Sequence, residues 1–144
     1  MASSFEKKMF TFALNTAARL ATNARTRALV PPLMRALAAA TRLQKRSAAP
    51  RATRSDADVA SAWQAYLPSR RQHPVVGSDA AGVRAEIRVS CPLRGSGDLD
   101  ACHALMEYDR ALLRPHGGGL TVLRSHASAG VHVCEVLLSR TGDP

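Results

Sequence analysis

The chain has 144 residues and a formal net charge of +9, and 46% of its residues are hydrophobic. No stretch reaches the roughly 18 apolar residues that a membrane span needs, and arginines interrupt every candidate signal-peptide core. We therefore expect no membrane partner, and three cysteines without a secretion signal favour reduced thiols in a cytoplasmic protein.

The basic charge is concentrated in the N-terminal third. Residues 1–54 hold eleven Lys or Arg and one acid, whereas residues 55–144 hold nine Lys or Arg and ten acids. Such a patch attracts nucleic acid or an acidic membrane, but no interleaved aromatics or recognition motif favour nucleic acid as the partner. An Arg-rich, acid-poor start is also typical of a mitochondrial transit peptide, and this alternative stays open.

The basic region 1–54 is expected to form a pair of helices. An approximate helical stripe of apolar residues covers 5–29, and Pro31 and Pro32 end that helix and open a second one, 32–46. The short connection predicts an antiparallel pair with its arginines exposed. Apolar residues along both helices also make homodimerisation through them an alternative.

The region 55–144 is predicted to form a short helix, followed by strands and one longer helix. Ser55 or Asp56 caps the short helix, and the segment up to residue 82 is expected to be a loop. In "VRAEIRVSC" (83–91) apolar and polar residues alternate. This pattern predicts a strand with one solvent-exposed face and with Cys91 at its last position. Pro92 is expected to end its pairing.

The remaining elements complete a small sheet. Asp98 is expected to cap a helix over 99–114, and the segments 120–126 and 131–139 are predicted to form a hairpin. This order predicts an α+β fold: a small, mainly antiparallel three-stranded sheet covered by helices, with the N-terminal helical pair in the same compact domain.

The helix over 99–114 carries Cys102, Met106 and Asp109 on one face. Asp109 is either a rim carboxylate paired with an arginine, or a buried acid, base or substrate anchor whose pKa depends on burial. Cys102 lies near the helix start, where free N–H groups stabilise a thiolate, although a cysteine on an apolar helix face is more often part of the core.

Cys91 and Cys134 are the other two thiols. Cys91 precedes a Gly-containing turn, where it can face a cleft, whereas Cys134 follows His132 by two residues, so both are expected on one strand face. A Cys–His pair activates a thiol or binds zinc. Zinc would need all three cysteines and a histidine to converge, and without a C-x-x-C spacing we expect no metal and no cofactor.

Residues 83–138 resemble the L-2-amino-thiazoline-4-carboxylic acid hydrolase family. The resemblance rests on "VRAEIRVSCPL", "LDACHALMEYDRALL" and "GVHVCEVLL", in which Cys91, Cys102, Asp109 and Cys134 match the family pattern. The chain departs from that pattern at three positions, which hold Met106, His126 and Glu135.

The resemblance implies an α+β hydrolase that opens a C–N bond of a small polar cyclic amidine or amide, in metabolism or natural-product biosynthesis. Cys91 would be the nucleophile, and Asp109 with His126 or His132 would move protons, with Cys134 also in the catalytic set. Backbone N–H groups of the turn 92–98 would stabilise the tetrahedral centre. Substrate contacts are expected from Cys102, Met106 and Glu135. A ligand-binding or partner-docking module without catalysis remains the alternative, beside nucleic-acid binding by the basic helices.

Overall fold

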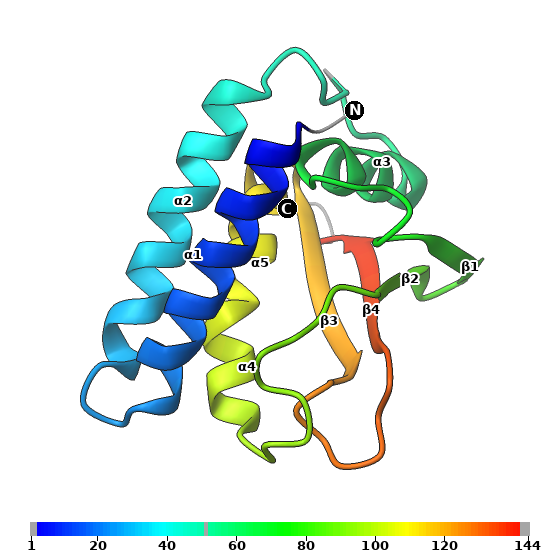
Figure 1. Cartoon of the computed structure of the whole chain (residues 1–144). Helices are drawn as coiled ribbons and strands as arrows, with labels where there is room; N and C mark the ends of the chain where they lie inside the picture. Colours follow the sequence, from blue (N-terminus) through cyan, green and yellow to red (C-terminus); the bar gives the residue numbers. More distant parts are fainter. Residues whose placement is uncertain (1–2, 51, 142–144) are drawn as a thin grey trace.

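The computed structural model describes residues 3–50 and 52–141 of the chain. The fold is α+β, with three helices in the first half of the chain and a four-stranded antiparallel sheet in the second, where two further helices lie between the second and third strands (Figure 1). The helices are α1 (Ser4–Thr22), α2 (Val30–Gln44), α3 (Asp56–Tyr66), α4 (Leu99–Leu105) and α5 (Glu107–Leu113), with short 3-10 turns at Arg27–Leu29 and Arg114–His116. The strands are β1 (Val75–Asp79), β2 (Gly82–Ile87), β3 (Gly118–Arg124) and β4 (Cys134–Arg140).

The first helix is shorter than predicted, because α1 ends at Thr22 and not at residue 29. Polar side chains bond to the backbone and turn the chain there: Asn23 Oδ1 accepts from the Arg25 N–H at 2.9 Å, and Thr26 Oγ1 donates to the Leu20 carbonyl at 2.6 Å. Such bonds compete with the helical ladder. The second helix then opens with its two prolines in the first turn, where a missing N–H costs nothing.

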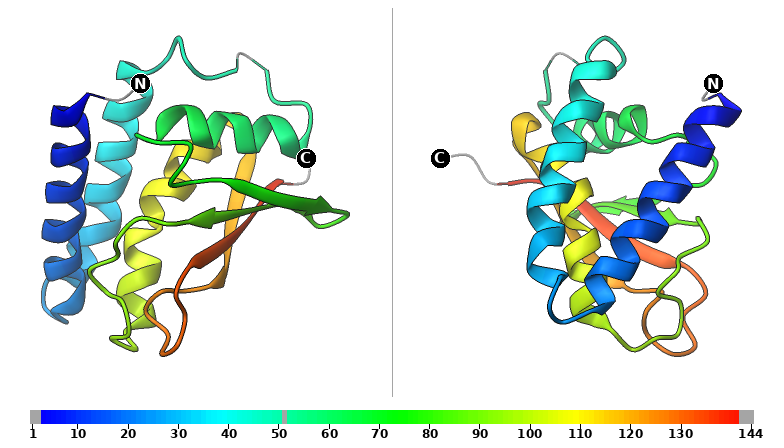
Figure 2. Two further views of the ribbon diagram at one scale, coloured as in Figure 1. Left: turned by 45° about the vertical axis from the view of Figure 1, so that its right-hand side comes forward. Right: turned by 60° about the vertical axis from the view of Figure 1, so that its left-hand side comes forward.

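Helices α1 and α2 are antiparallel, but each lies mainly against another helix, α1 over α4 and α2 along α5 (Figure 2). The prediction that their arginines are exposed is only partly correct. Arg27 donates to Asp98 Oδ2 at 2.9 Å with 30% of its side chain exposed, and Arg35 donates to Glu107 Oε1 at 2.9 Å. These bonds tie the basic helices to the start of α4 and to α5.

The sheet has the order β1-β2-β4-β3, so it contains one strand more than predicted. The missed strand, β1, pairs with β2 as a hairpin, from Val75 opposite Ala85 to Asp79 opposite Gly82. All five residues of β1 are exposed, so the segment lacks the alternation by which a half-buried strand is recognised.

The strand predicted to end at Cys91 ends at Ile87. The central partner β4 begins at Cys134, directly opposite Ile87, and the chain beyond that pair has no strand to bond with. Cys91 therefore lies in the connection 88–98, four residues past the strand. The pairing ends for lack of a partner, before Pro92 is reached.

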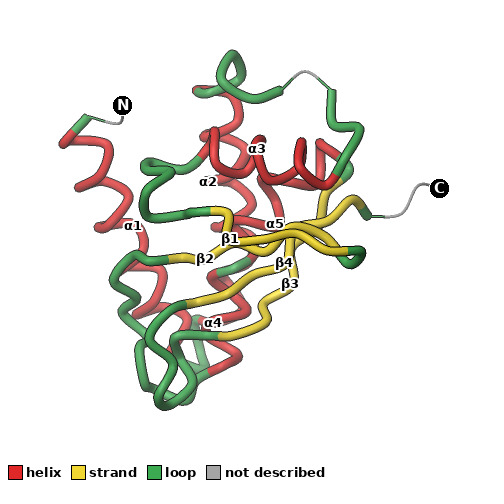
Figure 3. The backbone as a smooth tube through the Cα atoms, turned by 90° about the vertical axis from the view of Figure 1, so that its right-hand side faces the viewer, coloured by secondary structure: helices red, strands yellow, loops and turns green. Residues whose placement is uncertain are grey.

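One face of the sheet is covered by helices (Figure 3). The long helix predicted over 99–114 is present as α4 and α5, separated by Met106, whose ψ of −8° interrupts the regular helix. The predicted caps are confirmed: Ser55 forms a capping box with Asp58, and Asp98 Oδ1 accepts from the Ala101 N–H at 2.9 Å. Buried side chains from both the N-terminal helices and the sheet form one hydrophobic core.

Candidate functional site

A cavity of about 310 Å³ lies between α1, α2, the α4–α5 pair and one end of the sheet. Its wall is mostly apolar, with a small number of polar side chains, which is the usual make-up of a small-molecule site. The residues of its wall that carry reactive or titratable groups are Glu6, Lys45, Tyr66, His73, Cys91, Cys102, Tyr108, Asp109, His126 and Cys134. The structure thus brings all three cysteines and Asp109 to one space.

Asp109 reaches this cavity from α5. Its Oδ1 accepts a 2.7 Å hydrogen bond from Trp63 Nε1 of α3, and not from the arginine that a rim carboxylate would use. Burial among apolar neighbours raises the pKa of Asp109 to about 6, although the Trp63 bond opposes this shift. Such a carboxyl exchanges a proton near neutral pH, as a general acid or base must.

Cys91 lies half-buried in the connection after β2. Burial raises the pKa of its thiol, and the neighbouring Leu93 N–H lowers it by less. The resting group is therefore a thiol, and no environment comparable to a helix N-terminus holds it as a thiolate. A nucleophilic Cys91 would need a base during attack.

The turn after Cys91 offers fewer free N–H donors than expected for a tetrahedral centre. The Gly95 N–H donates to the His126 carbonyl at 2.9 Å and the Gly97 N–H to the Ala127 carbonyl at 2.7 Å, while Pro92 has none to give. The Leu93 N–H, beside the thiol, is the donor of this turn placed to serve such a centre.

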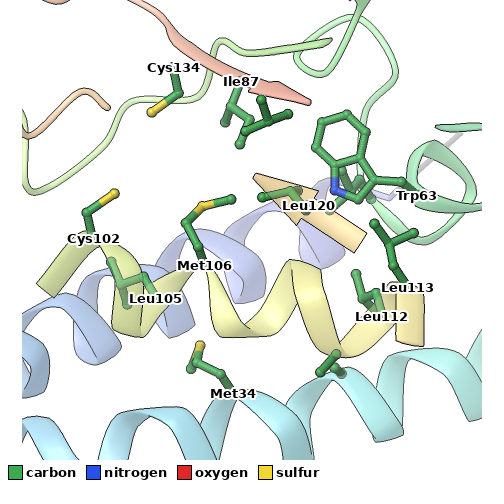
Figure 4. Close-up of a cluster of buried hydrophobic side chains, with 14 of the residues drawn as sticks. Met34, Trp63, Ile87, Cys102, Leu105, Met106, Leu112, Leu113, Leu120 and Cys134 are labelled. Atoms are coloured by element: carbon green, nitrogen blue, oxygen red, sulfur yellow. The ribbon is translucent and has the colours of Figure 1, made fainter. Parts of the chain in front are cut away.

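The other two thiols are buried. Cys102 on α4 and Cys134 on β4 point toward one another between the helix and the sheet (Figure 4). Ser125 Oγ donates to Cys102 Sγ at 3.0 Å, and the His126 N–H donates to Cys134 Sγ at 3.1 Å. Burial raises the pKa of Cys134 to about 11. Two consecutive residues of the β3–β4 connection, Ser125 and His126, therefore each bond one of these thiols, and the bond from His126 partly opposes the rise in the pKa of Cys134.

His126 is 1% exposed and also borders the cavity. Its Nε2 lies 2.7 Å from the His132 carbonyl, which only accepts, so Nε2 carries the proton and Nδ1 keeps a lone pair. Among the described residues, Nδ1 has no hydrogen-bond partner. A buried unpaired nitrogen is costly, and this one belongs to a residue of the cavity wall.

Two predicted site residues lie outside the cavity. His132 is exposed and precedes β4, so it does not share a strand face with Cys134. Glu135 occupies the opposite face of β4 from Cys134, where it pairs with Arg84 at 3.6 Å. Met106, in contrast, is buried and borders the cavity as predicted.

Five titratable cavity residues were not singled out by the sequence analysis: Glu6, Lys45, Tyr66, His73 and Tyr108. His73, expected on a loop surface, is 2% exposed: its Nδ1 lies 2.8 Å from the Ser69 carbonyl, and its ring packs edge-on against Trp63. Tyr108 bonds Thr41 Oγ1 at 2.9 Å, and burial raises its pKa to about 12. Only the helical stripe could have pointed to Tyr108, and no local pattern pointed to His73.

Within residues 3–50 and 52–141, no group of three or more His, Cys, Asp or Glu is arranged to hold a metal ion. No helix in the same ranges is long and apolar enough to cross a bilayer. No known protein-family model, curated protein or solved structure matches the chain.

Proposed function

We propose that the protein is a small-molecule hydrolase that cleaves a C–N bond of a cyclic amidine or amide, with Cys91 as nucleophile. The observation that carries the proposal is the meeting of Cys91, His126 and Asp109 around one cavity. A nucleophile, a proton acceptor and a carboxyl that titrates near neutral pH are the groups that this chemistry needs. The resemblance of residues 83–138 to L-2-amino-thiazoline-4-carboxylic acid hydrolases points to the same reaction.

The proposed reaction has two steps. In the first, Cys91 Sγ bonds to the amidine carbon, and its proton passes to His126 Nδ1. The C–N bond then breaks, and the leaving nitrogen takes the proton of Asp109. In the second, water adds to the thioester-like carbon and the C–S bond breaks. One proton of the water and the proton held on His126 restore the Cys91 thiol and the Asp109 carboxyl, while the other proton of the water stays on the product. The sum is one substrate and one water giving the opened product.

The direct test is turnover of 2-amino-thiazoline-4-carboxylate and related cyclic amidines, followed as a gain of one water by mass spectrometry. We expect Cys91→Ser to lose nearly all turnover, because a serine hydroxyl is far less acidic than a thiol. Cys102→Ser, which alters another cavity cysteine, is the matched control and should keep measurable turnover. Full turnover by Cys91→Ser would contradict the proposal.

A ligand-binding module without catalysis is the second candidate, and the raised pKa of Cys91 favours it. A cavity in which burial raises the pKa of Cys91 and Cys134 suits reversible binding as well as it suits attack. The two candidate functions predict different results for the same experiments. A binding module retains a cyclic amidine unchanged after prolonged incubation, and its affinity does not depend on whether residue 91 is Cys or Ser.

Homodimerisation through α1 stays part of the proposal. Phe5, Met9 and Phe12 lie on its outer face, with 72%, 50% and 66% of their surfaces exposed. A dimer would cover this apolar stripe, so Phe5→Ser with Phe12→Ser should give a monomer by light scattering. A wild-type monomer at all concentrations would remove this proposal.

We also propose a cytoplasmic location, which the three free thiols support. Nucleic acid remains the less favoured partner, because several basic side chains of the N-terminal region are already paired with Glu6, Asp98 and Glu107. Phosphate-driven binding falls steeply with salt. Tight DNA or RNA binding at low salt that disappears as salt rises would favour nucleic acid as the partner after all.

A further inference from the structure

The cavity has two chemically different parts. The part described above holds the thiols, His126 and Asp109. The other part lies between α1 and α2. Its wall is mostly apolar, from Met9, Phe10, Ala13, Leu14, Met34 and Leu37, with the polar side chains of Glu6, Thr41, Gln44 and Lys45 beside them. Met9 is half exposed, so this part reaches the molecular surface.

The charges near the α1–α2 part are already satisfied. Glu6 of α1 and Lys45 of α2 form an ion pair with each other across the two helices. Thr41 Oγ1, the nearest hydroxyl on α2, bonds Tyr108 and donates to the Leu37 carbonyl. Polar groups on a ligand would therefore find few partners here, whereas apolar groups would displace water from an apolar wall.

The volume also exceeds what a single small ring needs. An apolar cavity of about 150 Å³ accommodates benzene, and this cavity measures about 310 Å³. A five-membered heterocycle held beside Cys91 and Asp109 would leave the space between α1 and α2 unfilled.

We propose that the substrate carries an apolar substituent, an aromatic ring or a short alkyl chain, which binds between α1 and α2 while its amidine or amide group faces Asp109 and Cys91. This deepens the proposed function, on which it rests for the polar end of the ligand. It changes the expected substrate from a small polar heterocycle to an amphipathic one.

The test uses the fluorescence of Trp63, the single tryptophan of the chain, which bonds the carboxylate that would contact the amidine. Benzamidine, acetamidine and benzyl alcohol serve as probes of the whole ligand, the polar end and the apolar end. We expect benzamidine to bind at least tenfold more tightly than acetamidine. Ala13→Phe, which fills the α1–α2 part, should remove that advantage.

Ala36→Phe is the matched control, because it makes the same change at an exposed position of α2. It should leave benzamidine affinity within twofold of wild type, and circular dichroism verifies that both variants are folded. Calorimetry repeats the titrations without relying on Trp63.

The outcomes separate the two proposals. If benzyl alcohol binds and is blocked by Ala13→Phe while neither amidine binds, the apolar part is supported and the amidine chemistry is overturned. If benzamidine and acetamidine bind equally well, or if Ala13→Phe changes nothing, the apolar subsite is overturned while the proposed reaction still stands. If neither aromatic probe binds, the apolar subsite is overturned as well.

Discussion

Trp63 Nε1 and Asp109 Oδ1 lie 2.7 Å apart, and this bond joins α3 to α5 at the wall of the cavity. It gives the carboxylate one strong donor but no positive charge. The pKa of Asp109 therefore remains raised to about 6 by burial. The unfolded chain has the ordinary value of about 3.9, so the folded state binds this proton more tightly than the unfolded state does.

The first prediction concerns Asp109→Asn. Because the folded pKa is raised, the contribution of Asp109 to stability is full below pH ~4 and is lost as pH rises through about 6. The asparagine oxygen can still accept from Trp63 and carries no charge. At pH 7.5 we expect the variant to be more stable than wild type by about 1–3 kcal/mol, with no advantage below pH ~4.

Urea unfolding from pH 4 to 8 measures this difference. Asp100→Asn is the control, since its side chain is 82% exposed and should show a flat difference. A difference in stability between Asp109→Asn and wild type that does not change with pH would show that burial does not raise the pKa of Asp109.

The second prediction removes the donor. Trp63→Phe deletes the N–H that lowers the pKa of Asp109 and leaves a gap where a fully buried ring stood. We expect a loss of about 2–4 kcal/mol at pH 7.5. In the Asp109→Asn background the loss should be smaller by about 1 kcal/mol, because no charge is left without its donor. An identical loss in both backgrounds would mean that the Trp63 bond is no stronger to the charged carboxylate than to the neutral amide.

Part of this site was predictable from sequence. Helical spacing placed Cys102, Met106 and Asp109 on one face, and the structure has them there. His132 does not share a strand face with Cys134, because strand alternation holds only within the paired segment and β4 begins at Cys134. Glu135, which the resemblance suggested, lies on the other face of β4 and does not border the cavity. Nothing local revealed that the apolar space between α1 and α2 adjoins the thiols, since it depends on how distant helices pack.

The third prediction concerns thiol reactivity. The sequence suggested a lowered pKa for the nucleophile, whereas burial raises the pKa of Cys91. We expect iodoacetamide to modify Cys91 first, because Cys102 and Cys134 are buried, but with an apparent pKa above the value of about 8.5 for a free thiol. Pulse alkylation with mass spectrometry between pH 6 and 10 measures it, and the urea-unfolded chain, in which all three react alike, is the control. An apparent pKa below that of a free thiol would restore the original expectation.

The fold was more predictable than the site for a physical reason. Caps such as Ser55 and Asp98, and the alternation in β2, are local signals that survive in the structure. β1 was missed because all its side chains are exposed, so that it is held by its backbone pairing with β2 and by the Asp79–Arg84 ion pair at 3.2 Å. The end of β2 was set by its partner β4, which no local pattern in residues 83–91 records.

The fourth prediction concerns Glu107, which bonds both Arg35 and Arg114. Burial alone would raise the pKa of Glu107, but the two arginines outweigh it and lower the pKa. Its contribution to stability is therefore present above the ordinary value and is lost as pH falls. Glu107→Gln should cost about 1–2 kcal/mol at pH 7 and progressively less below pH ~4. Glu135→Gln, at a more exposed ion pair, is the control and should cost less than about 0.5 kcal/mol. Thermal unfolding of both variants at both pH values measures these losses of stability.

The last prediction tests the packing of α3 on the sheet. A Cβ built on Gly118, at the start of β3, would lie 2.6 Å from Val59 Cγ1, which is too close for any real contact. Val59 is fully buried, so neither group can move aside freely. Gly118→Ala should therefore cost about 1–3 kcal/mol through overpacking. Gly77→Ala is the matched control, because nothing lies within 4 Å of its Cβ position.

The same contact predicts a rescue. Val59→Ala alone leaves a gap and should destabilise the protein, but in combination with Gly118→Ala the new methyl group occupies part of that gap. The double variant should be more stable than the sum of the two single losses predicts, by about 1 kcal/mol or more. Urea unfolding of the four proteins gives this coupling directly. Additive losses would show that α3 does not contact β3 at Gly118, which would also displace Trp63 and its bond to Asp109 from the cavity wall.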